Sequence, residues 1–179
     1  MKKLTSALLA TAVLSSGAMA TEVGFYAGGG LALQAVPNYP DWEMGLGAVV
    51  RGGMTLDAVL EGFGAEVELT KSLVDPKANY TVDPGNEKIN VTTLASYAVY
   101  RIPVTDIIYV KPRFGIIFPN LGGAEYAGSG ENVVNSRDVT FSSGIGGGIT
   151  IMKHLDAYID YTVIGESITN YGAGVEFHF

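Results

Sequence analysis

The chain has 179 residues, with 18 acidic side chains against 11 lysines and arginines, and a formal net charge of −7. This acidic balance excludes a nucleic-acid binder that neutralises phosphates with a basic surface, and the lack of cysteine excludes disulfides and a lipid-modified cysteine. Hydrophobic residues make up 47% of the chain, yet beyond the amino-terminal region no apolar run approaches the roughly 18 residues of a membrane-spanning helix.

The first twenty residues have the three parts of a secretory signal peptide. Lys2 and Lys3 precede the apolar run 4–14, and Ala18-Met19-Ala20 is a small-x-small cleavage sequence. The apolar run is too short to span a bilayer. We therefore expect a cleaved signal peptide at residues 1–20 and one mature domain at residues 21–179.

The mature region divides into eight segments in which apolar side chains recur at every second position. Successive side chains of a strand point to opposite faces, so each segment predicts a β-strand with one apolar face. In the fourth segment we assign Val91, Ala95, Tyr97 and Val99 to that face, and Tyr100 to the other. The eight expected strands are 23–33, 44–54, 59–71, 87–101, 107–118, 137–151, 155–164 and 168–179.

Glycine is frequent inside these segments, with 24 residues in the chain and clusters at 28–30 and 144–148. A phosphate-binding loop needs its glycines between a strand and a helix. No helical pattern follows these clusters. The glycines therefore favour close backbone approach and sheet curvature over nucleotide binding.

The connections alternate in length. The links after the first, third and fifth segments are long, those after the second, fourth and sixth are tight, and only the link after the seventh departs from this order. The long links are predicted as loops at 34–43, 72–86 and 119–136.

Charged residues in the middle of the segments lie opposite the apolar face. An apolar face alone fits either the core of a soluble sandwich or the lipid face of a membrane barrel. A lysine or arginine facing lipid at mid-depth costs about 2–4 kcal/mol, so in a barrel these charges must face the lumen. We expect an interior network that fills and closes the lumen, made of Glu66, Glu68, Lys111, Arg113, Tyr100, Tyr109, Tyr158 and Asp160.

The last segment alternates aromatic and apolar side chains up to the final residue, with Tyr171, Val175, Phe177 and Phe179 on one face. This resembles the C-terminal signature of small eight-stranded bacterial outer-membrane β-barrels, the family of the OmpA membrane domain and OmpX. The resemblance implies an all-β, antiparallel, up-and-down transmembrane barrel with both termini in the periplasm. It also implies contact with outer-membrane lipid and lipopolysaccharide, and recognition of the C-terminal strand by the barrel-assembly machinery.

Three classes of function remain open. The first is a structural or porin-like barrel, in keeping with the resemblance. The second is an adhesion or ligand-binding surface on the long loops, and the third is a lipid A-modifying enzyme or a lateral conduit for apolar molecules. The chain has two histidines, His154 and His178, at no metal-ligand spacing in the sequence. We therefore expect no catalysis, no cofactor and no metal.

Overall fold

The computed structural model describes residues 23–35, 42–79, 86–88, 90–122, 139–165 and 168–179. The expected signal peptide at residues 1–20 lies outside this part of the chain. Within it, the strands are β1 (Phe25–Ala35), β2 (Gly45–Thr55), β3 (Phe63–Val74), β4 (Lys77–Asn79), β5 (Asn86–Lys88), β6 (Asn90–Tyr100), β7 (Ile102–Pro103), β8 (Ile108–Gly122), β9 (Thr140–Met152), β10 (Leu155–Ile164) and β11 (Ile168–His178). None of the described residues belongs to a helix that is long and apolar enough to cross a membrane.

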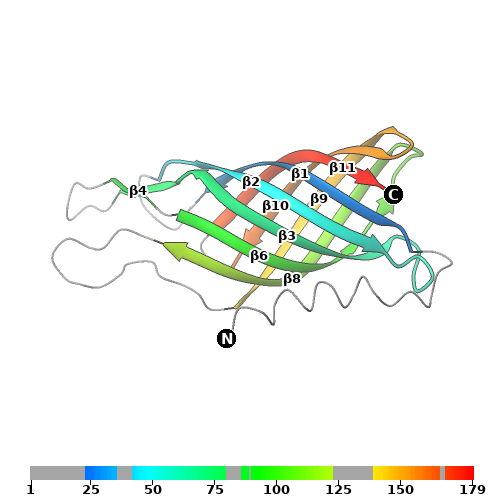
Figure 1. The fold of residues 1–179 in the computed structure, drawn as a ribbon, viewed down its shortest axis with the longest axis horizontal. Helices are drawn as coiled ribbons and strands as arrows, with labels where there is room; N and C mark the ends of the chain where they lie inside the picture. Colours follow the sequence, from blue (N-terminus) through cyan, green and yellow to red (C-terminus); the bar gives the residue numbers. More distant parts are fainter. Residues whose placement is uncertain (1–22, 36–41, 80–85, 89, 123–138, 166–167) are drawn as a thin grey trace.

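Eight long strands form one antiparallel sheet that closes into a barrel (Figure 1). Each long strand pairs with its neighbours in the chain, and the pairing of β1 with β11 joins the two ends of the sequence. Figure 1 shows β4 beyond one end of the barrel and the C-terminus at the other. We call these ends the hairpin rim and the terminal rim. The predicted eight-stranded, antiparallel, up-and-down barrel is confirmed.

The short strand β7 continues β6 in the same register against β8. Between them the ladder is interrupted at Tyr100 and Arg101, where the register places Tyr100 opposite Pro112. Proline has no backbone N–H to donate to a ladder. On the side of β3, the Arg101 N–H donates to the carbonyl of Gly62, which directly precedes β3, at 2.6 Å.

Apolar side chains cover the outside of the barrel. Large exposed examples occur on every long strand and include Leu31, Val50, Leu69, Leu94, Phe114, Ile145, Ile159 and Val175. The charged side chains of the same strands are buried inside, apart from the exposed Lys71 near the end of β3. This is the reverse of a soluble sandwich, in which the apolar faces meet each other, so the sandwich alternative is wrong.

All three predicted loops contain more strand than expected, and the first of them, 34–43, begins with the end of β1, which runs to Ala35. The region 72–86 begins with the end of β3, which runs to Val74, and then forms β4, which pairs with β5 in a separate two-stranded sheet. The predicted loop 119–136 begins with the end of β8, which runs to Gly122. Turn-forming residues predict the ends of strands, but β8 continues past Pro119 because β6 supplies hydrogen-bond partners, and β3 stays paired with β2 up to Val74.

The assignment of faces in the fourth segment is wrong. Tyr97 is 2% exposed and faces the lumen, whereas Tyr100 is 38% exposed and faces outward. Both faces of this segment carry apolar residues, so its own pattern is ambiguous. The register decides it, because Tyr97 and Ala95 lie opposite Glu66 and Glu68 of β3, and cross-strand partners share a face.

Candidate functional site

The lumen contains a network of seven charged side chains that are almost completely buried. They come from five strands and consist of three cations, Arg51, Lys111 and Arg113, and four anions, Glu66, Glu68, Asp160 and Glu176. Each lies on the inward parity of its strand, opposite the apolar residues. We call this set the lumen network.

Arg51 joins three of the four acids. Its Nη2 lies 2.8 Å from Glu68 Oε2 and 2.6 Å from Asp160 Oδ2, and its Nη1 lies 3.4 Å from Glu176 Oε1. The residue therefore connects β3, β10 and β11 across the lumen from its own position on β2.

Arg113 binds the same region from β8, on the other side of the barrel. Its Nη1 lies 2.7 Å from Glu68 Oε2 and 3.2 Å from Glu66 Oε1, and its Nη2 lies 3.5 Å from Asp160 Oδ1. The same Nη2 also donates to the Thr162 hydroxyl. Two planar guanidinium groups thus hold one set of carboxylates between them.

Lys111 completes the arrangement. Its Nζ lies 3.0 Å from Glu66 Oε2 and 2.6 Å from Glu176 Oε1. As a result each of the four acids contacts two different cations. An uncompensated buried charge costs several kcal/mol, so this double pairing is what makes the burial of seven charges tolerable.

Tyrosine side chains enclose the network. The Tyr26 hydroxyl donates to Glu66 Oε2 at 2.8 Å. The guanidinium carbon of Arg51 lies 3.9 Å from the centre of the Tyr158 ring, and that of Arg113 lies 4.7 Å from the centre of the Tyr97 ring. These rings stabilise the cations through their π faces and displace water from the lumen.

Toward the hairpin rim the lumen becomes uncharged and then apolar. The Ser72 hydroxyl donates to Gln34 Oε1 at 2.7 Å and accepts from the Val91 N–H at 3.0 Å. Trp42 packs against a buried apolar cluster that includes Val91, Ile117, Ile164 and Ile168. Burial among such side chains lowers the local dielectric and strengthens electrostatic contacts.

Toward the terminal rim a second, smaller group of polar side chains lines the lumen. Arg101 Nη1 lies 2.7 Å from Asp156 Oδ2, and His178 Nε2 lies 3.1 Å from the same oxygen. The Arg101 guanidinium carbon lies 3.7 Å from the centre of the Tyr109 ring. Asp156, Glu176 and His178 are the described side chains grouped closely enough to hold a metal ion.

The structure brings most of the expected network residues together. Glu66, Glu68, Lys111, Arg113 and Asp160 share contacts, Tyr158 stacks on Arg51, and Tyr109 lines the lumen nearer the terminal rim. The prediction for Tyr100 is wrong, because its strand presents Tyr97 to the lumen instead.

Four residues were left out of the expected network, namely Tyr26, Arg51, Arg101 and Glu176. Arg51 and Glu176 alternate with the apolar residues of their segments, and this alternation alone could have placed them in the lumen. What the sequence did not provide is which strands face each other across the barrel.

The C-terminal strand presents its aromatic side to the outside. Tyr171, Val175, Phe177 and Phe179 are all exposed on the outer surface. The Phe179 N–H donates to the Phe25 carbonyl at 2.9 Å, so the last residue is held to the first strand.

Solved structures with the same fold are outer-membrane proteins. The chain is similar to Ail of Yersinia pestis, crystallised with the heparin analogue sucrose octasulfate, with 11% identity, a TM-score of 0.59, and coverage of 89% of this chain and 100% of that one. It is also similar to a major outer membrane protein of Thermus thermophilus (14% identity, TM-score 0.61, 89% and 100% coverage). OprG of Pseudomonas aeruginosa aligns with 9% identity, a TM-score of 0.56, and 87% and 95% coverage.

At these identities the likeness establishes the fold alone, and no curated protein matches the chain significantly. A family model for the outer membrane protein beta-barrel domain matches residues 6–179. The apolar exterior, the charged lumen and this match together show that the chain belongs to the outer membrane protein beta-barrel domain family.

Proposed function

We propose that the protein is a structural barrel of the outer membrane whose lumen is closed to ions and solutes at rest. The observation that supports this most is the double pairing of each of the four buried acids with two buried cations. A permeating ion would have to separate several of these pairs at once. Each separated pair leaves a buried charge without a partner, at a cost of several kcal/mol.

We place the terminal rim in the periplasm and the hairpin rim outside the cell. The short turns of outer-membrane barrels lie on the periplasmic side, and here they join β2 to β3 and β9 to β10 at the terminal rim. In this orientation the outward-facing Tyr171, Val175, Phe177 and Phe179 form the signal that the barrel-assembly machinery recognises. The apolar exterior contacts the acyl chains of phospholipid and lipopolysaccharide.

The role is non-enzymatic. A triad of the hydrolase type needs a nucleophile and a histidine within hydrogen-bond reach of each other. His154 lies in the turn between β9 and β10, with its ring centre 6.1 Å from that of Phe177, and His178 is paired with Asp156. Neither arrangement favours a lipid A-modifying reaction.

Conductance in planar lipid bilayers tests the closed-lumen proposal. We expect no steady conductance from the refolded protein, and openings from Arg113→Ala, because this change removes contacts to three acids. Lys71→Ala is the matched control, because Lys71 is an exposed cation of β3. Steady conductance by the wild-type protein, or an Arg113→Ala variant as closed as the wild type, would contradict the proposal.

A binding role for the hairpin rim is the second candidate. The β4–β5 sheet is tied to the start of β2 by the Glu43–Lys77 bridge, whose side chains meet at 2.7 Å. This gives the hairpin rim an ordered platform outside the barrel. Because the chain has a net charge of −7, we expect such a surface to favour cationic or neutral partners over a polyanion.

A further inference from the structure

Asp156, Glu176 and His178 form a cluster near the terminal rim, in which Glu176 also belongs to the lumen network and Asp156 and His178 do not. Asp156 on β10 and Glu176 on β11 are direct cross-strand partners, and His178 follows Glu176 by two residues on the same face. One ligand atom from each of the three side chains lies within 4.8 Å of the other two. Asp156 and Glu176 are buried, whereas the His178 side chain is 25% exposed and opens toward the rim.

The chemistry of these three side chains suits a transition-metal ion of the zinc type. An imidazole nitrogen with two carboxylate oxygens is a usual ligand set for zinc, and three protein ligands leave a fourth position for water. The presence of nitrogen and the small number of oxygens disfavour calcium and magnesium, which prefer six or more oxygen ligands.

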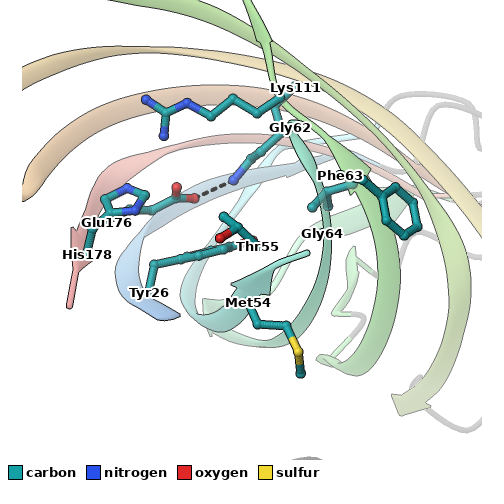
Figure 2. Close-up of a pocket in the computed structure, with 11 residues that line it drawn as sticks. Tyr26, Met54, Thr55, Gly62, Phe63, Gly64, Lys111, Glu176 and His178 are labelled. Atoms are coloured by element: carbon teal, nitrogen blue, oxygen red, sulfur yellow. Dashed lines mark hydrogen bonds and ion pairs between the residues drawn. The ribbon is translucent and has the colours of Figure 1, made fainter. Parts of the chain in front are cut away.

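A small cavity lies beside the cluster. It has a volume of about 20 Å³, and its lining includes Tyr26, Lys111, Glu176 and His178. Figure 2 shows the Glu176 and His178 side chains next to each other at this cavity, with Lys111 bound to the Glu176 carboxylate. Space for about one water molecule requires roughly 10–15 Å³, so the cavity can admit a single ion-sized occupant.

The tyrosine stacked on Arg101 has an unsatisfied hydroxyl. Tyr109 is 2% exposed, and its hydroxyl has no hydrogen-bond partner among the described residues. The Tyr109 side chain crosses from β8 over Gly148 of β9 toward β10, and its ring lies beneath the Arg101 guanidinium that binds Asp156.

The charge balance of the lumen suits a divalent cation once Arg101 leaves the cluster, because two negative charges then remain. Including Arg101 and Asp156, four basic side chains face five acidic ones, which leaves one negative charge when His178 is neutral. Arg101 is the basic group at the cluster itself, and its side chain is 32% exposed. It can therefore leave Asp156 when a metal ion enters, whereas the deeply buried Lys111 stays on Glu176.

We propose that Asp156, Glu176 and His178 bind one divalent transition-metal ion of the zinc class at the terminal rim, in competition with Arg101. Metal binding would lock β10 to β11 beside the junction with β1. The site shares Glu176 with the lumen network, and zinc binding is measured independently of whether the lumen conducts.

Calorimetric titration of the refolded protein with ZnCl₂ at neutral pH tests the site. We expect one zinc ion per chain, and binding weakened by at least about tenfold in His178→Ala. His154→Ala is the matched control, because His154 is the chain's other histidine and lies in a turn outside the cluster. It should bind as the wild type does.

Arg101→Gln provides a gain-of-binding variant that misfolding cannot imitate. Removal of the competing guanidinium should tighten zinc binding about tenfold, while calcium chloride in place of zinc should give no heat of binding. The proposal is overturned if the wild type binds no zinc at millimolar concentration. It is also overturned if His154→Ala loses binding as His178→Ala does, or if Arg101→Gln binds no more tightly than the wild type.

Discussion

Tyr158 shows how single residues make room for the lumen network. A Cβ atom added to Gly30 would lie 2.8 Å from the Tyr158 hydroxyl, and one added to Gly174 would lie 2.6 Å from it. The Tyr158 ring stacks on the Arg51 guanidinium. Tyr26 lies in the same way over Gly53, and Tyr109 over Gly148. The glycines therefore form the flat surfaces against which the tyrosines pack, which gives a specific reason for their abundance in the strands.

Gly30→Ala tests this packing. The added methyl would meet the Tyr158 hydroxyl and backbone atoms of β11, and we expect a loss of about 1–3 kcal/mol in the free energy of unfolding. Gly52→Ala is the control, because a Cβ there comes no closer than 3.7 Å to its nearest neighbour. Urea unfolding of the refolded variants measures both. Equal stabilities of the two variants would show that the lumen is not tightly packed at Tyr158.

The charged residues could be predicted individually but not as a network. Alternation along the strands alone placed five charged residues inside, namely Glu66, Glu68, Lys111, Arg113 and Asp160. In the structure these side chains are buried and contact each other in the lumen. Parity does not say which strands face each other across a closed barrel. For that reason the contacts by which Arg51 and Glu176 complete the double pairing could be identified only from the structure.

Among the elements, β6 shows where a strand's own pattern stops being informative. Its two faces carry Val91, Ala95 and Val99 on one side and Leu94 and Ala98 on the other, so neither is clearly polar. The neighbouring β3 has an unambiguous charged face, and pairing with it fixes the orientation of β6. A strand of this kind can be oriented correctly only together with its partners.

The orientation of β6 can be measured with single cysteines, because the chain has none of its own. A bimane label at Ala98→Cys should be quenched by brominated lipids, because Ala98 faces outward. Ala95→Cys should resist labelling, because Ala95 is buried in the lumen. If the label at position 95 were quenched and the label at position 98 were not, the observed orientation of β6 would be contradicted and the orientation predicted from the sequence supported.

At the scale of the whole molecule, the barrel is layered along its axis. A polar group with Arg101, Asp156 and His178 lies near the terminal rim, the lumen network fills the middle, and an apolar cluster with Trp42 closes the lumen toward the hairpin rim. The alternation of apolar and charged residues predicted the strands and their faces, and the resemblance of the last strand to outer-membrane barrels implied the closed barrel. The layering could not be predicted, because it depends on the relative shift of neighbouring strands.

The barrel is stable because its lumen charges compensate each other while its apolar face meets lipid. A double-mutant cycle on Arg113 and Glu68, which lie 2.7 Å apart, tests it most directly through urea unfolding in lipid vesicles. We predict that Arg113→Ala and Glu68→Ala each destabilise the barrel, and that the double variant loses less than the sum of the two by about 1–3 kcal/mol. Strictly additive losses would contradict the claim, because they would mean that the two charges do not stabilise each other.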